Sequence, residues 1–208
     1  MSTVEFPTVV DAPQAWMRAD VEAVTTWRRD LTIDQVAEIE AAAGPIVEGM
    51  QDIGCMEKTD FPLTTLAEDI PFWVDSLLND FGFLHICGLK TGPENIRRAA
   101  AIFYGLGLHL GRPRSQNAKG HVLGHVCDLG LSTNDPNVRI YQTRERQNYH
   151  TDSCDVAGLM CLKPAKRGGE SGIVSSMAIY NEMRTEYPDL LAELLKPMHV
   201  DRRGEVTA

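Results

Sequence analysis

Apolar residues recur at helical spacing in three parts of the first half of the chain. Thr32 and Gln35 form a capping-box pattern before the first of these, and Gly44–Pro45 is expected to end that helix after residue 43. A second helix is predicted around residues 73–78. Pro93 opens a third that continues toward Gly105, because proline is well tolerated in the first turn of a helix.

One apolar run in this half, residues 81–88, predicts a buried strand between the second and third helices. Residues 1–30 have only weak periodicity and contain two prolines and two tryptophans, so we expect an extended arm laid over the domain. Residues 31–110 are accordingly interpreted as a helical N-terminal part with one strand.

The pattern changes after Arg112 to short apolar runs separated by turn residues. Runs at 122–123, 138–141, 156–162 and 172–174 predict strands, and helical spacing returns at 179–187 and again from Pro188. Helices in front and strands behind favour an α+β domain with a β core rather than alternating βαβ units. Residues 111–208 are interpreted as the first part of that core, within one domain spanning 1–208.

Composition narrows the functional classes. The 208 residues are 43% hydrophobic, as in a globular domain, and the net charge of -9 argues against a nucleic-acid partner, which needs clustered basic residues. No apolar stretch approaches the ~20 residues that span a bilayer, and five cysteines without a CxxC pair are typical of reduced thiols. We expect a cytoplasmic protein that binds a small molecule and no membrane, and the pattern leaves the oligomeric state open.

The chemistry is concentrated in a His-x-Asp pair, His150 and Asp152, just before the apolar run at Val156. Residues two apart on a strand project to the same side, so one imidazole and one carboxylate would converge on a point. They would supply two thirds of the 2-His-1-carboxylate triad that holds ferrous iron with open positions. The alternative is an ordinary loop histidine beside an aspartate in a turn.

A second segment, Gly168-Gly169-Glu170-Ser171, strengthens the first interpretation. The run from His150 to Leu195 resembles the taurine dioxygenase-like (TauD/TfdA) family, in which a WHTD-like metal motif precedes a strand and a GGDT-like turn. This chain has YHTD and GGES. Looser similarity in GFLHICGL and GLGLHLGRPRSQ extends the resemblance over most of residues 72–205.

The resemblance implies a partial double-stranded β-helix, a jelly-roll or cupin-like core, and an Fe(II)- and 2-oxoglutarate-dependent dioxygenase. Such an enzyme hydroxylates a small organic substrate and releases succinate and carbon dioxide. By the match, His150 and Asp152 are iron ligands, and the hydroxyl of Ser171 binds a carboxylate of the co-substrate 2-oxoglutarate. The substrate-lining candidates are Gln116, Asn117 and Arg146, for which solvated roles are the alternative.

The resemblance also implies a second histidine ligand and a co-substrate arginine farther along, which this chain lacks at the expected places. His199 lies in a segment that resembles the connector before the family's last strands, so we do not assign it as a ligand. The C-terminal strands are therefore expected to be missing, and the chain by itself to bind iron weakly and turn over little or nothing.

Two other functions stay open. One is a catalytically inactive metal-binding or interaction module of the same fold. The other is a hydrolase that uses Cys154 as nucleophile and His150 as base, although no glycine elbow surrounds this cysteine.

Overall fold

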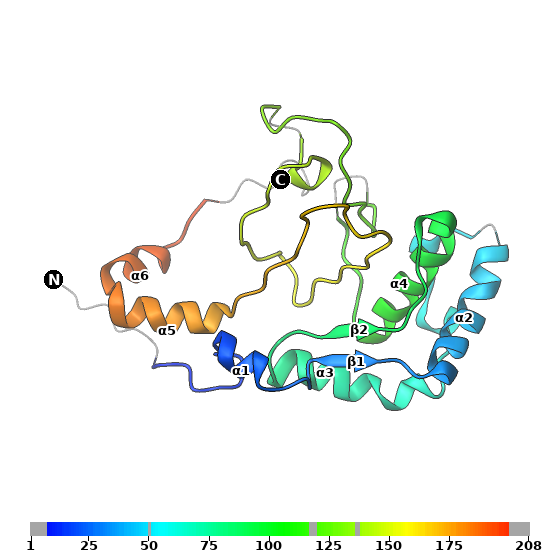
Figure 1. Ribbon diagram of the computed structural model, residues 1–208, viewed down its shortest axis with the longest axis horizontal. Coiled ribbons are helices and arrows are strands. Elements are labelled where there is room, and N and C mark those ends of the chain that lie inside the picture. Colours follow the sequence, from blue (N-terminus) through cyan, green and yellow to red (C-terminus); the bar gives the residue numbers. More distant parts are fainter. Residues whose placement is uncertain (1–7, 50, 117–119, 136–137, 200–208) are drawn as a thin grey trace.

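The structure is a computed structural model that describes residues 8–49, 51–116, 120–135 and 138–199 (Figure 1). Helices dominate the described residues, and both strands lie in the first half of the chain. In chain order the helices and strands are α1 (Arg18–Glu22), β1 (Arg28–Asp30), α2 (Ile33–Glu48), α3 (Ile70–Asn79), β2 (His85–Cys87), α4 (Ile96–Leu110), α5 (Ser176–Glu186) and α6 (Pro188–Leu194).

Helices α2, α3 and α4 enclose the hydrophobic core, together with short 3-10 turns between α2 and α3. The largest fully buried side chains are Phe61, Ile39, Leu66 and Ile102. Phe61 lies so close to α4 that a Cβ atom on Gly105 would approach its ring to 2.4 Å. The absence of a side chain at this position therefore lets a phenyl ring pack directly on the helix backbone.

Helix α2 confirms the predicted cap but not the predicted end. Thr32 Oγ1 accepts a hydrogen bond from the Gln35 backbone at 3.2 Å, and the Gln35 side chain accepts one from the Thr32 backbone at 3.0 Å. The helix continues beyond Pro45 to Glu48, because Ile46 is buried in the core. The guanidinium of Arg97 also donates to the backbone carbonyls of residues 46, 47, 49 and 51 at 2.7 to 3.3 Å, which satisfies the end of the helix.

Strands β1 and β2 form a parallel two-stranded sheet in which Arg28 is paired with His85 and Asp30 with Cys87. The predicted strand at 81–88 is confirmed only over its last part, because β1 offers β2 a partner over three residues. Arg29 donates to Ser76 of α3 at 3.3 Å, so α3 lies against one face of this sheet (Figure 1).

The N-terminal part is more ordered than the predicted extended arm. Residues 8–30 include α1 and β1. Residues 8–17, which lie before α1, have no regular secondary structure. Trp16 Nε1 donates to the Phe81 carbonyl at 2.8 Å, and the Trp16 ring packs edge-on against Phe83 at 5.6 Å between centroids. These contacts attach the segment to the end of α3.

The predicted β core is not present in the described residues. None of the four runs at 122–123, 138–141, 156–162 and 172–174 forms a strand, and Ile140–Gln142 is a 3-10 turn instead. A strand needs a neighbour for its backbone N–H and C=O groups. Within the described part of 111–175, such pairing is limited to a bond from residue 116 to residue 121 and two bonds from residues 127 and 129 to residues 141 and 142.

The two halves of the described chain differ in how they bury apolar side chains. Every buried hydrophobic residue except Leu191 precedes residue 111. Most of the large exposed ones follow it, including Val126, Leu159 and Ile173. The fold is thus a helical body with a core, followed by a long irregular segment and the helix pair α5–α6. Within the described residues no helix is long and apolar enough to cross a bilayer.

Candidate iron site

The structure brings the side chains of His150 and Asp152 together. His150 Nε2 lies 3.9 Å from Asp152 Oδ1, and the two side chains are 49% and 59% exposed. They lie on irregular backbone rather than on a strand, and their approach shows that both side chains still point to one side. Two donors at this separation can both reach one metal ion, since bonds from imidazole nitrogen and carboxylate oxygen are about 2.0–2.2 Å long.

One hydrogen bond of His150 leaves Nε2 unprotonated, and a second, from Gln147, is made to Nε2 and would have to be displaced by a metal ion. Nδ1 lies 2.9 Å from the Asn148 carbonyl oxygen, which can only accept, so the ring proton is on Nδ1. Nε2 then carries the lone pair, toward which the Gln147 amide donates at 3.1 Å. A carbonyl that fixes the tautomer of a ligating histidine is the usual second partner in metal sites. The donor set therefore fits Fe(II) in its chemistry.

The residue after the GGES turn, Gly172, lies against the side chain of Tyr149. A Cβ atom on Gly172 would lie 2.6 Å from the hydroxyl of Tyr149, the residue before His150. Both glycines of the turn have a left-handed backbone, with φ of 72° at Gly168 and 81° at Gly169. Ser171 is exposed, and its role toward 2-oxoglutarate stays a prediction.

Two of the other predicted site residues, Gln116 and Arg146, lie in the described residues and make no hydrogen bond or ion pair with this group. Gln116 is exposed and bonds to backbone, its N–H donating to the His121 carbonyl at 2.6 Å and its side chain to the Arg114 carbonyl at 3.3 Å. Arg146 is exposed, and no hydrogen bond or ion pair joins it to His150 or Asp152. Asn117 lies outside the described residues. The substrate-lining roles therefore stay predictions.

A third metal ligand is not found among the described residues. No group of three His, Cys, Asp or Glu side chains in this part of the chain could hold a metal ion. His199 is exposed near the end of the described chain, and Arg202 and Arg203 lie outside it. Cys154 is exposed too and makes no hydrogen bond to His150, so the structure gives the cysteine-hydrolase alternative no catalytic pair.

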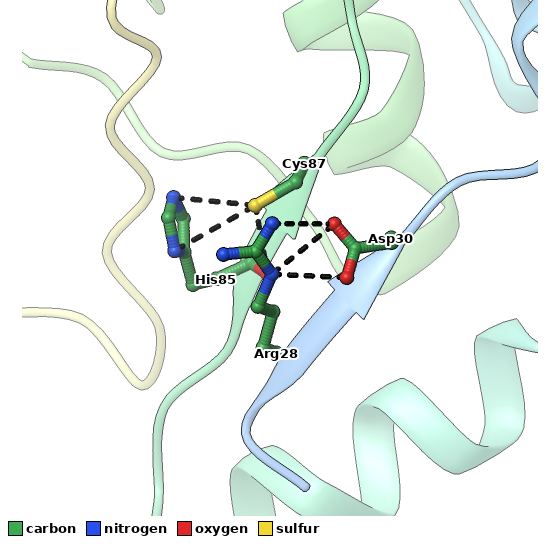
Figure 2. A network of polar contacts seen from close by, with 4 residues as sticks. All are labelled: Arg28, Asp30, His85 and Cys87. Carbon is green, nitrogen blue, oxygen red and sulfur yellow. Dashed lines mark hydrogen bonds and ion pairs between the residues drawn. The ribbon is translucent and has the colours of Figure 1, made fainter. Parts of the chain in front are cut away.

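A second polar cluster covers the face of the β1–β2 sheet opposite α3 (Figure 2). Arg28 donates to both carboxylate oxygens of Asp30 at 2.7 to 3.1 Å, and this pairing raises the pKa of the guanidinium and lowers that of the carboxyl. The Cys87 thiol lies 3.6 and 3.7 Å from the two ring nitrogens of His85. Because arginine donates to both oxygens of its carboxylate, this cluster offers a metal ion no oxygen donor unless that ion pair breaks.

Comparison with known proteins shows the family of the chain and does not distinguish between these two clusters. The family described as taurine catabolism dioxygenase TauD, TfdA family matches residues 47–206, a span that omits β1 and includes β2 as well as His150, Asp152 and Ser171. The chain belongs to the TauD/TfdA family. TauD/TfdA membership implies a cupin-like fold and, typically, Fe(II)- and 2-oxoglutarate-dependent oxygenase chemistry, although the described residues hold few strands.

Two relatives of this TauD/TfdA chain are longer than it is. FR-33289 synthase of Streptomyces rubellomurinus (strain ATCC 31215) is 32% identical over 197 residues, which are 94% of this chain and 58% of that protein. The taurine hydroxylase-like protein SAT17 of Stachybotrys chartarum (strain CBS 109288 / IBT 7711) is 27% identical over 166 residues, 76% of this chain and 43% of that protein. The chain thus spans about half the length of the relatives that it matches.

Sequence reasoning found the two candidate ligands but not their supporting residues. Gln147 and Asn148 immediately precede the motif, yet polar residues beside a histidine are too common to signal a hydrogen bond to its ring. Ser175 was also missed, although a serine just before the helical spacing of residues 176–186 is a typical N-cap.

Proposed function

We propose that this chain supplies the iron-binding part of an Fe(II)- and 2-oxoglutarate-dependent dioxygenase that hydroxylates a small organic substrate. The observation that carries the proposal is the 3.9 Å approach of His150 Nε2 to Asp152 Oδ1, within residues that match the TauD/TfdA family. The word hydroxylase in the name of one relative agrees with this class of reaction.

Each residue of the site has one task in this proposal. His150 and Asp152 hold the metal, and the Asn148 carbonyl keeps the imidazole in the tautomer that can bind it. The hydroxyl of Ser171 donates to a carboxylate of 2-oxoglutarate and so orients the co-substrate. When bound, Fe(II) and 2-oxoglutarate supply the oxygen activation, with succinate and carbon dioxide as the co-products. The protein contributes positioning and exclusion of water.

The affinity for iron follows from the donor count. Two protein ligands hold a metal less firmly and in a less defined geometry than three. Both candidate ligands are about half exposed, so water competes for the same positions. We therefore expect these 208 residues to bind Fe(II) weakly and to release little or no succinate.

The second candidate is a non-catalytic metal-binding module of the same fold. This candidate is favoured by the small number of metal ligands, since the described residues lack a group of three metal-binding side chains. The two proposals differ in one outcome. A longer protein that also contains the family's distal histidine and arginine should decarboxylate 2-oxoglutarate if the enzyme proposal is right, and should not do so if the module proposal is right.

Anaerobic calorimetric titration of Fe(II) tests the site in the chain itself. His150→Ala and Asp152→Ala are each expected to lower the affinity by at least about tenfold, since each removes a direct ligand. His125→Ala is the matched control, because His125 is also an exposed histidine of the irregular segment. Equal affinity in all four proteins would place the metal elsewhere and refute the proposed site.

A further inference from the structure

The N-terminal segment and α5, far apart in the sequence, are joined by one asparagine side chain. Asn181 Nδ2 donates to the Val10 carbonyl at 2.8 Å, and Asn181 Oδ1 accepts from the Val10 backbone N–H at 2.8 Å. A single amide thus satisfies both backbone groups of one residue, as a neighbouring strand would do. Figure 1 shows the N-terminal segment running alongside α5.

A second bond joins the same two elements at the start of α5. The Ser175 hydroxyl donates to the Gln14 carbonyl at 2.5 Å and accepts from the Ala178 backbone N–H at 2.9 Å. One buried hydroxyl, whose residue is 5% exposed, therefore both caps α5 and attaches it to the N-terminal segment.

The N-terminal segment is in turn attached to the helical body. Gln14 Nε2 donates to the Leu78 carbonyl at 2.8 Å, and Trp16 Nε1 donates to the Phe81 carbonyl at 2.8 Å. Residues 10–16 consequently form a strap between the end of α3 and the start of α5.

Polar bonds rather than apolar packing hold α5 on this strap. No residue of α5 is buried, and its exposed side chains include Met177 and Ile179. A cavity of about 420 Å³, lined by Ala15 and Met17 from one side and by α5 from the other, separates the two elements beside Asn181. The bonds of Asn181 and Ser175 therefore contribute to holding α5 in place.

The position of α5 matters for the candidate iron site, because the GGES turn leads directly into it. Ser171 precedes Ser175 by four residues, and Gly172 lies against Tyr149, which precedes His150. We propose that Asn181 and Ser175 are positioning residues that hold the hydroxyl of Ser171 at the iron site through the strap. This inference rests on the proposed function for the role of Ser171.

Hydrogen exchange of the full chain tests the strap directly. Asn181→Leu keeps the size of the side chain and removes both bonds to Val10. Exchange is expected to rise in residues 8–16 and in residues 172–179, with α2 and α4 unchanged. Thr185→Ala is the matched control on α5, because the Thr185 hydroxyl bonds only to the Asn181 carbonyl within the helix.

Titration with Fe(II) and with 2-oxoglutarate adds a measurement that a general loss of stability would not change selectively. In Asn181→Leu the affinity for Fe(II) alone is expected to stay as in the wild type, while the affinity of the Fe(II)-loaded chain for 2-oxoglutarate falls about tenfold, the loss typical of one displaced hydrogen bond to a charged group. Equal losses for both ligands would overturn the positioning role.

Two further outcomes distinguish a failure of the strap from a failure of the role proposed for Ser171. A rise in exchange limited to residues 8–16, or one that spreads through α2 and α4, would overturn the strap whatever the ligand data show. If the wild-type chain binds iron but not 2-oxoglutarate, the role proposed for Ser171 fails, and exchange in residues 172–179 still decides whether the strap holds the turn.

Discussion

The contact between Phe61 and α4 allows a stability prediction with an internal control. Gly105 and Gly107 lie in the same helix, and replacing either by alanine adds one methyl group. At Gly105 the new Cβ would lie 2.4 Å from Cγ and Cδ2 of Phe61, whereas at Gly107 it would meet nothing within 4 Å. The two variants therefore differ only in whether the methyl group has space.

The expected magnitudes follow from this difference. Alanine in place of glycine inside a helix contributes about 0.8–1 kcal/mol of helix propensity, which both variants gain. Phe61 is fully buried and cannot swing into solvent to release the clash. Overpacking of this kind costs roughly 1–3 kcal/mol. Gly107→Ala should thus be slightly more stable than the wild type, and Gly105→Ala less stable than Gly107→Ala by roughly 1–3 kcal/mol.

Urea unfolding monitored by circular dichroism at a fixed pH measures the two differences. Unchanged slopes with separated midpoints would show that the native state is affected. In the background of Phe61→Leu, which removes the ring, the cost of Gly105→Ala should shrink. Equal midpoints for the two alanine variants would refute the packing of Phe61 against Gly105.

Two polar side chains carry the remaining predictions. Burial would raise the pKa of Glu38, but hydrogen bonds from the Thr64 hydroxyl and from the backbone N–H groups of residues 64–66, at 2.5 to 2.9 Å, outweigh it and lower the pKa to about 2. The bonds therefore stabilise the fold above the ordinary pKa near 4.5, and this contribution is lost as the pH falls from there to about 2. Glu38→Gln should lower the free energy of unfolding by about 2 kcal/mol at pH 7, after allowance for solvent screening, and should not change it near pH 2. A difference between the urea midpoints of wild type and variant that stays constant across this pH range would contradict the prediction. Arg97→Met removes the donor for the carbonyls at the end of α2 and should cost about 2–3 kcal/mol with faster amide exchange in the last turn, whereas Arg18→Met, at an exposed ion pair, should change neither.

The helices could be predicted from the sequence because their signals are local. Spacing of apolar residues and a cap within one turn located α2, α3 and α4. The end of α2 could not be predicted, because Arg97 stabilises it from about fifty residues away. The strands expected between 122 and 174 failed for a related reason: an apolar run signals a strand only if another segment pairs with it, and the described residues offer almost none.

In the candidate site, too, the features with a local signal could be predicted and the long-range contacts could not. The approach of His150 to Asp152 was predicted from their spacing of two residues, and the structure confirms it on irregular backbone instead of a strand. Ser171 was assigned from resemblance alone, and its role stays a prediction. The bonds between Val10 and Asn181 could not be predicted, since nothing in either local pattern refers to a segment 171 residues away.

Among the described residues, all buried hydrophobic side chains but one precede residue 111, and the segment with the candidate ligands adds only partly buried side chains, such as Val122 and Met160, to this core. Substitutions at exposed positions between residues 112 and 174 can therefore change metal affinity or substrate choice at little expense in stability. Mutations there that strengthen ligand binding and mutations that weaken it should have similarly small effects on the stability of the fold. Selection on this protein can act on ligand binding separately from folding, which favours divergence of specificity on a constant helical scaffold.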